Sequence, residues 1–334
     1  MDDNYFDKIV FQSSLLISIV LSSRDFRPCK KSIKIKMSKF IDFFDDIPIA
    51  FLETKRGVIR YRKSGNGPPL LMLHGNPQTH AMWHKVAPNL IQNYTVICPD
   101  IPGYGKSFKP ELSANHEEYS KVNMAKDIEE FMRLLNFNSF YVLAHDRGAR
   151  VAHRLALDFP NKVLKMILLD IIPTIEHFER ANMEFAMGYY HWFWLAQRNP
   201  IPESVIQKAP EEWFYAHTSR EKKDKNFFSP NALSDYLECV KNPRTIGAIC
   251  EDYRAASTVD LRDDKNSRDN KVKLNIPLMV LWGSKGKIEQ WYDPISIWKN
   301  YCSAEVRGFG INTGHYLAEE APEEIIKCVR EFLV

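Results

Sequence analysis

The stretch Tyr141–Arg150 (YVLAHDRGAR) constrains the fold more than any other part of the sequence. It reads as a short buried strand that runs directly into the start of a helix, with small residues, Ala144 and Gly148, two places to either side of Asp146. This is the spacing of a nucleophile elbow, a strained turn that exposes one side chain above a parallel sheet. A carboxylate there can attack as a nucleophile and form an ester. The simpler interpretation is an aspartate that caps a helix, so partners elsewhere in the chain must decide.

Strand-like and helix-like segments alternate around this elbow. Residues 50–53 and 58–62 flank a turn at 54–57 and predict a hairpin. Apolar runs typical of strands buried on both faces are 69–73, 94–98, 140–144, 163–169 and 278–282, with a weaker strand at 305–308. Helices are predicted over 123–135, after the elbow, and over 323–332. The pattern predicts a doubly wound, mostly parallel α/β sheet, which binds ligands at the carboxyl ends of its strands.

The alternation stops between Pro173 and about Thr258. This segment has a mostly helical pattern, is interrupted by five prolines, and carries six aromatic residues within positions 185–194. A helix that is apolar on every side must be buried on more than one side. We therefore predict a helical cap over 173–258 that excludes water from the elbow, inserted into a core of residues 38–172 and 259–334. Most of these aromatic residues are expected to form the core of the cap itself.

Residues 1–37 are predicted to be a poorly defined extension of the folded domain. Their apolar run, 9–22, is too short to span a bilayer as a helix, and acidic residues precede it where a secretory signal is basic. The net charge of +3 is too small to indicate nucleic acid or a membrane as a partner. The six cysteines are scattered without a CxxC pair, which favours reduced thiols in a cytoplasmic protein.

The catalytic partners of an aspartyl ester can be sought at the ends of the other strands. Histidine is the usual base that activates water against an ester. His315 lies between the last predicted strand and the last helix, so the nucleophile precedes the histidine, as in α/β-hydrolases. Residues 284–287 (SKGK), after the strand at 278–282, offer no carboxylate to orient this histidine. Asp170, at the end of the preceding strand, is the preferred orienting acid, with a loop cap as the alternative.

The turn at residues 74–77 (HGNP) follows the strand at 69–73. An HGxP turn in this position directs a backbone N–H toward the elbow. The backbone N–H groups of Asn76 and Arg147 would then form an oxyanion hole for attack of water on the ester. His74 is expected to be a structural histidine and not a base.

Arg147 and Arg150 indicate the class of substrate. A substrate with its own carboxylate would be repelled by Asp146, and two guanidinium groups would balance the two negative charges. Salt bridges on the helix surface are the alternative role. Two arginines packed around an elbow favour a carboxylate substrate.

The sequence resembles the haloacetate (fluoroacetate) dehalogenases of the α/β-hydrolase superfamily from about Phe40 to the C-terminus. The matching stretches are HGNPQTHAMWHKVAP, DIPGYGKS, AHDRGAR, ILLDIIPT, YYHWFWLAQ, CEDYRAA and NTGHYLAEEAPE. The stretch HDRGAR with its two arginines is specific, whereas HGxP and the GYGKS turn are shared across the superfamily. Asn76 departs from the larger apolar residue expected there and resembles haloalkane dehalogenases.

The resemblance implies a role for each candidate residue. Asp146 would be the nucleophile, His315 the base and Asp170 its acid. Arg147 and Arg150 would hold the substrate carboxylate. A halide pocket would be formed by His191, Trp192 and Tyr253, each of which has an N–H or O–H donor.

The expected function is therefore hydrolysis of short 2-haloacids, for example of haloacetate to glycolate and halide, through an aspartyl ester and without a metal or organic cofactor. A small haloacid is the expected partner, with no nucleic acid and no membrane, and the resemblance allows a homodimer. Two alternatives stay open. An epoxide hydrolase of the same fold would use cap tyrosines, although the arginine pair argues against a neutral epoxide. A binding protein that has lost catalysis would not need the set Asp146, Asp170 and His315.

Overall fold

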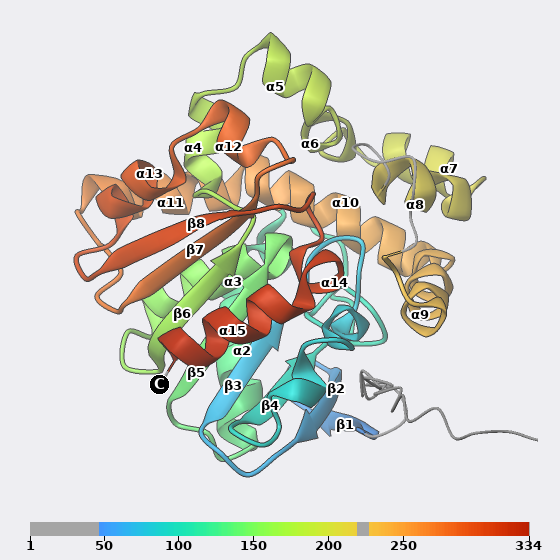
Figure 1. Ribbon diagram of the computed structural model, residues 1–334. Helices are drawn as coiled ribbons and strands as arrows, with labels where there is room; N and C mark the ends of the chain where they lie inside the picture. The colour runs from blue at the N-terminus through green and yellow to red at the C-terminus, as the bar shows by residue number, and fades with distance from the viewer. Residues whose placement is uncertain (1–46, 219–226, 334) are drawn as a thin grey trace, which may run out of the picture. The chain divides into compact units, whose positions relative to one another are not determined.

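The computed structural model describes residues 47–218 and 227–333. An eight-stranded sheet with the order β1-β2-β4-β3-β5-β6-β7-β8 forms its centre (Figure 1). The strands are β1 (Ile49–Glu53), β2 (Val58–Ser64), β3 (Pro69–Leu73), β4 (Thr95–Pro99), β5 (Phe140–His145), β6 (Val163–Leu169), β7 (Leu278–Gly283) and β8 (Val306–Ile311). Strands β3 to β8 are parallel, whereas β1 and β2 pair antiparallel. The predicted mostly parallel α/β sheet is confirmed; the predicted extension 1–37 lies outside the described residues.

Strand β8 differs most from its predicted range of 305–308. It extends to Ile311, and alternate residues face the solvent, as expected for the edge of a sheet. Glycines at 308 and 310 weaken the apolar pattern from which the strand was predicted. A Cβ at Gly308 would lie 1.8 Å from the carbonyl oxygen of Val280, so this glycine allows β8 to pack closely beside β7.

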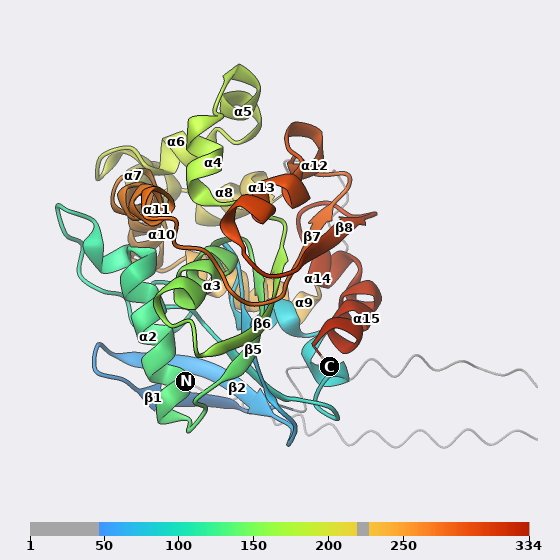
Figure 2. The ribbon, with the colours of Figure 1, turned by 90° about the vertical axis from the view of Figure 1, so that its left-hand side faces the viewer.

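Helices cover both faces of the sheet (Figure 2). On one face lie α2 (Lys121–Leu134), α3 (Asp146–Asp158) and α13 (Pro294–Tyr301), and on the other lies α15 (Pro322–Phe332). The remaining short elements of the core are η1 (His80–Trp83), η2 (Ala87–Asn89), η3 (Glu117–Tyr119), α12 (Ile288–Trp291) and α14 (Leu317–Glu320). Helix α2 begins two residues earlier than predicted because the hydroxyl of Ser120 caps it by accepting from the N–H of Asn123.

Within the segment predicted as a cap, the chain forms a series of helices beyond the carboxyl ends of the parallel strands (Figures 1 and 2). They are α4 (Thr174–Glu179), α5 (Met183–Gly188), α6 (His191–Leu195), α7 (Ile201–Ile206), α8 (Pro210–Thr218), α9 (Pro230–Val240) and α10 (Pro243–Ser257), and α11 (Val259–Asp269) follows. The prolines that interrupt the sequence pattern lie at or next to the starts of α7 to α10. Proline is favoured in the first turn because its missing N–H has no helical partner there.

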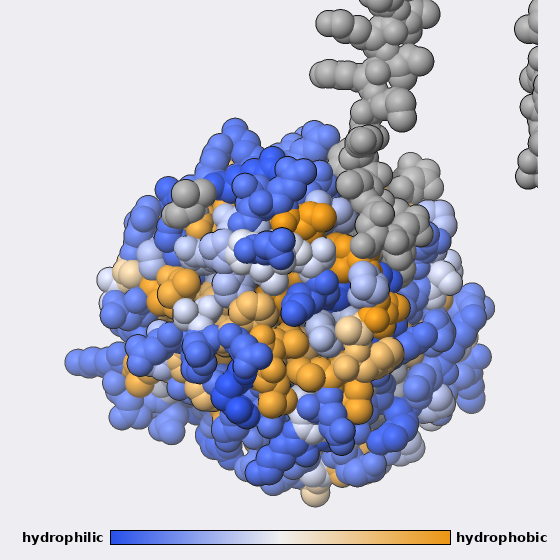
Figure 3. All heavy atoms as spheres, turned by 90° about the horizontal axis from the view of Figure 1, so that it is seen from below, coloured by the Kyte–Doolittle hydropathy of each residue, from blue (hydrophilic) through white to orange (hydrophobic). Residues whose placement is uncertain are grey.

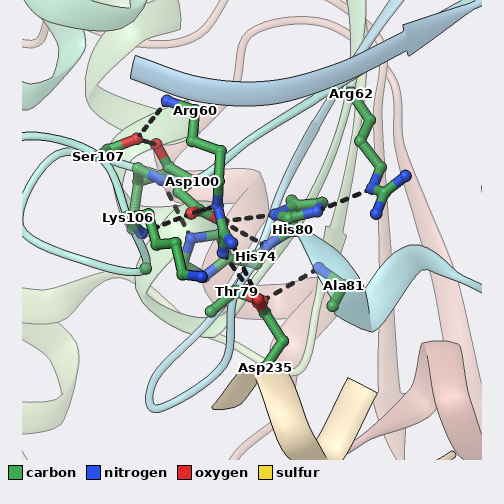
Figure 4. A network of polar contacts seen from close by, with 12 residues as sticks. Arg60, Arg62, His74, Thr79, His80, Ala81, Asp100, Lys106, Ser107 and Asp235 are labelled. Carbon is green, nitrogen blue, oxygen red and sulfur yellow. Dashed lines mark hydrogen bonds and ion pairs between the residues drawn. The ribbon is translucent and has the colours of Figure 1, made fainter. Parts of the chain in front are cut away.

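A buried ion-pair network joins α9 to the core (Figure 4). Arg60 of β2 donates from Nε to Asp100 at 2.5 Å and from both terminal nitrogens to Asp235 of α9 at 2.8 Å. Asp100 also accepts from the backbone N–H of His80 at 2.9 Å and contacts its Nδ1 at 2.8 Å. Thr79 donates its hydroxyl to Asp235. Because Arg60 is fully buried, these contacts fix α9 against the core without exposure to solvent.

The end of the sheet away from these helices has a mostly polar surface. Seen from below, this face is largely hydrophilic with an area of apolar residues near its centre (Figure 3). Elsewhere in the described chain, large apolar side chains also stay exposed, among them Phe51 of β1 and Met183 of α5. None of the described helices is both long enough and apolar enough to cross a membrane.

Candidate active site

Asp146 occupies the turn between β5 and α3. Its backbone has a φ of 45°, a left-handed conformation that is costly for a residue with a side chain and that is found at functional sites. The turn also requires close packing. A Cβ at Gly148 would lie 2.2 Å from the carbonyl oxygen of His74, and one at Gly75 would lie 2.7 Å from the Cβ of Asp146. The structure therefore has the strained elbow that the spacing predicts.

His315 and Asp170 lie beside the elbow. The Nδ1 atom of His315 is 2.5 Å from Oδ2 of Asp170, and its Nε2 atom is 4.0 Å from Oδ2 of Asp146. Asp170 follows β6 with a φ of 56°, and its Oδ1 atom accepts from the backbone N–H of Gly283 at 2.9 Å. The ends of β6 and β7 together hold this carboxylate, which in turn orients the imidazole toward Asp146.

The HGNP turn also meets the elbow. The backbone N–H of Asn76 donates to Oδ1 of Asp146 at 2.9 Å. The side-chain amide of Asn76 lies 3.0 Å from Nε2 of His217 on α8. His74 is fully buried between the carbonyl of Gly75, at 2.9 Å, and the N–H of Ile101, at 3.0 Å. Both nitrogens of His74 are therefore used in local structure.

The charge state of Asp146 follows from its neighbours. Burial alone would raise the pKa of this carboxyl group. Nearby His315 and the guanidinium groups of Arg147 and Arg150 outweigh burial and hold the pKa well below its usual range. Asp146 is therefore ionised at neutral pH, which is the form that can act as a nucleophile.

A narrow cavity opens above Asp146. Its volume is about 30 Å³. The predicted site residues that line it are Asn76, Asp146, Arg150, Asp170, His191, Trp192, Tyr253 and His315. The rings of His191 and Trp192 lie 5.8 and 6.1 Å from that of Tyr253. Side chains from the core and from the cap helices α6 and α10 thus meet around one small space.

Arg147 is paired with a carboxylate of the protein itself. Its Nε and Nη2 atoms donate to the carboxylate of Asp252 at 2.8 and 2.6 Å, and Nη2 also donates to the carbonyl of Asp252. Arg147 is fully buried and does not line the cavity. Burial would lower its pKa, but Asp252 raises it well above the usual value. Asp252 therefore engages two of the three guanidinium nitrogens, whereas Nη1 has no hydrogen-bond partner among the described residues. A contact between Arg147 and a substrate carboxylate stays a prediction.

Arg150 does face the cavity. Its Nη1 atom donates to the carbonyl of Ile172 at 3.1 Å and to the hydroxyl of Thr174 at 3.0 Å. Within the described chain, its buried Nε atom has no hydrogen-bond partner. The guanidinium carbon lies 4.7 Å from the ring centre of Trp192. Burial and the charge of Arg147 lower the pKa of Arg150 to about 10, so the group stays positive at neutral pH.

Other residues of the site were not predicted from the sequence. Asp252 lies beside Tyr253 in the CEDYRAA stretch. Its position in a stretch that matches the family is the sequence signal that could have identified it as a site residue. His177 and His217 also line the cavity, but nothing in the sequence distinguishes them among ten histidines. Among the described residues, no group of three or more His, Cys, Asp or Glu side chains is arranged to hold a metal ion.

Comparisons with known proteins agree with this fold. The family model for the α/β hydrolase fold matches residues 68–322. A fluoroacetate dehalogenase from Burkholderia sp is 38% identical over 275 residues, which cover 80% of this chain and 88% of that protein. A soluble epoxide hydrolase from Corynebacterium sp. (strain C12) is 28% identical over 277 residues, covering 82% and 93%. The solved structure of a protein from Nostoc sp PCC 7120 superimposes with a TM-score of 0.84 and 45% identity, over 86% of this chain and 98% of that one. The chain therefore belongs to the α/β-hydrolase family, as a hydrolase of the haloacetate dehalogenase type.

Proposed function

We propose that the protein hydrolyses short 2-haloacids, such as fluoroacetate and chloroacetate, to the 2-hydroxyacid and halide. The observation that carries the proposal is the position of Arg150, a cation in the same small cavity as Asp146 and His315. A guanidinium group beside an ionised nucleophile can hold a substrate that is itself negatively charged. The 38% identity to a fluoroacetate dehalogenase supports this substrate class.

In the first step, an oxygen of Asp146 attacks the carbon that bears the halogen. A carbon–oxygen bond forms, the carbon–halogen bond breaks, and its electron pair leaves with the halide. Donors on His191, Trp192 and Tyr253 would stabilise the negative charge that develops on the halogen. The product of this step is an ester between Asp146 and the acid.

In the second step, water attacks the carbonyl carbon of the ester. His315 accepts a proton from this water, and Asp170 holds the imidazole in position. The backbone N–H of Asn76, which is 2.9 Å from Oδ1 of Asp146, would stabilise the oxyanion. The ester bond then breaks, the hydroxyacid leaves, and the Asp146 carboxylate is restored.

Epoxide hydrolysis is the second candidate. Three tyrosines, Tyr189, Tyr253 and Tyr316, line the cavity and could protonate an epoxide oxygen. The similarity to a soluble epoxide hydrolase also favours it. Two observations favour the haloacid instead: the cavity is small, and a cation faces it although a neutral epoxide needs none.

The test measures both reactions with the same preparation. The full-length protein is incubated with fluoroacetate, with chloroacetate and with styrene oxide, and released halide and diol are quantified. Asp146→Asn serves as the inactive control. We expect halide from the haloacetates, little diol, and neither product from the variant. Diol formation without halide release would reject the haloacid proposal in favour of an epoxide hydrolase.

A further inference from the structure

We propose that His177 is a second hydrogen-bond donor to the substrate carboxylate, beside Arg150. This inference rests on the proposed function and describes how the site would bind its anionic substrate. We call the pair of side chains Arg150 and His177 the anion site.

The backbone places the two side chains together. Thr174, at the start of α4, accepts a hydrogen bond from Nη1 of Arg150 at 3.0 Å. His177 lies three residues further along α4, on the same side of the helix as Thr174. Both members of the anion site also contact one indole: the guanidinium carbon of Arg150 lies 4.7 Å, and the imidazole centre of His177 lies 4.9 Å, from the ring centre of Trp192. Both side chains line the cavity.

His177 has one nitrogen without a partner. It is fully buried and lines the cavity. Its Nδ1 atom lies 3.1 Å from the hydroxyl of Tyr292, whereas Nε2 has no hydrogen-bond partner among the described residues. Buried polar atoms are rarely left unpaired in folded proteins, so a ligand is a natural partner for this nitrogen. If the Tyr292 hydroxyl donates to Nδ1, the imidazole proton is on Nε2, which is then a donor.

The charge of the site fits a carboxylate. Burial, together with the charge of Arg150, keeps the pKa of His177 well below its usual value, so the ring is neutral at physiological pH. The Nε–H of Arg150 is also buried without a partner in the described chain. A carboxylate has two oxygens, and the anion site offers one charged and one neutral donor to them. Arg147 does not line the cavity, and Asp252 binds its Nε and Nη2 atoms.

The test measures binding without turnover. In an Asp146→Asn background, calorimetry gives Kd for fluoroacetate and for the neutral fluoroacetamide. Adding His177→Phe, which keeps a ring but removes the donor, is expected to weaken fluoroacetate binding by about 10- to 100-fold, as for loss of a hydrogen bond to a charged group. Fluoroacetamide binding should change by less than about threefold, which is within the range of a packing change.

Two further variants separate donor loss from damage to the fold. His177→Gln keeps an N–H donor and should retain most of the fluoroacetate affinity. His153→Phe is the matched control, because His153 is likewise buried with an unpartnered Nε2 in the described chain but does not line the cavity. It should leave both Kd values unchanged.

Several outcomes would overturn the inference. Unchanged fluoroacetate binding in His177→Phe, or equal losses for fluoroacetate and fluoroacetamide, would mean that His177 only packs against the cap. If His177→Phe does not fold, His177→Gln replaces it in the test. Because His177→Gln keeps an N–H donor, a loss of fluoroacetate binding as large as that in Arg150→Leu would also reject a donor role. The proposed function fails in a different way. Wild-type protein would then release no halide, while the binding data would still show whether the anion site holds a carboxylate.

Discussion

The charge balance at the site depends on the contacts of two neighbouring arginines, Arg147 and Arg150. Arg147 is paired with Asp252, and among the described residues Arg150 is the only arginine or lysine that lines the cavity. Asp146 is ionised, so the approach of a second carboxylate would be unfavourable without a nearby positive charge. Under the proposed function, Arg150 would therefore be the side chain that distinguishes a haloacid from a neutral substrate.

Replacing Arg150 with leucine should raise KM for haloacetates and lower kcat/KM by about 10²–10⁴-fold, since losing one partner of a buried charge pair costs about 3–5 kcal/mol. Any activity on neutral short haloalkanes should change little. Arg154→Leu is the matched control, because Arg154 lies one turn further along α3 and is bonded to Asp158 and Ser267. Equal losses on charged and neutral substrates would make Arg150 a structural residue.

Candidate site residues at the ends of strands can be predicted from the sequence more readily than contacts between residues on helices. A strand precedes each of three candidates, Asp146, Asp170 and His315. Parallel strands bring their carboxyl ends together independently of the segments that connect them. The pairing of Arg147 with Asp252 joins α3 to α10, which are separated by about one hundred positions. Such a contact depends on how the cap packs on the core, and no local pattern in the sequence contains it.

Helix α9 shows how the segment predicted as a cap is attached to the rest of the chain. Adjacent residues of α9 enter two buried polar networks: Asp235 binds Arg60, and the hydroxyl of Tyr236 donates to Glu319 at 3.0 Å. Gln78 also donates to Glu319, at 2.5 Å. The sequence predicts a helical cap but not these attachments, since Asp235 and Tyr236 contact a strand and a helix of the core that lie far from them in the chain.

Asp235→Ala should lower the free energy of unfolding by about 3–5 kcal/mol, because it leaves the buried guanidinium group of Arg60 with only Asp100 as a carboxylate partner. The control on the same helix is Glu238→Ala, which removes an exposed ion pair with Lys106 and should cost less than about 1 kcal/mol. Urea unfolding monitored by circular dichroism measures both. Similar small losses for the two variants would show that the buried network does not anchor α9.

For the whole molecule, buried carboxyl groups predict how stability changes with pH. Burial raises the pKa of Glu319 from 4.5 to about 8, although hydrogen bonds from Tyr236 and Gln78 oppose the shift. Burial likewise raises the pKa values of Asp127 and Asp264 to about 7. Between the unfolded and folded pKa values the folded protein binds more protons than the unfolded chain. The stabilisation from these protons is complete below the unfolded pKa and is lost as the pH rises through the folded pKa.

Glu319→Gln mimics the protonated side chain and tests this directly. Between about pH 5 and pH 8, the wild-type protein should lose on the order of a few kcal/mol of its free energy of unfolding through Glu319. The variant should lose correspondingly less, so the two stability curves should converge at low pH and separate at high pH. Parallel curves over this range would mean that Glu319 is already ionised in the folded protein.

The mass of the trapped intermediate tests most directly whether Asp146 forms a covalent ester with a haloacetate. His315→Gln should block hydrolysis of the ester without preventing its formation, because the first step needs no base. After incubation with chloroacetate or fluoroacetate, mass spectrometry of the peptide containing Asp146 should show the added mass of one carboxymethyl group. The same peptide from Asp146→Asn should be unmodified. An unmodified Asp146 peptide in a His315→Gln protein that still binds fluoroacetate would contradict the proposed mechanism.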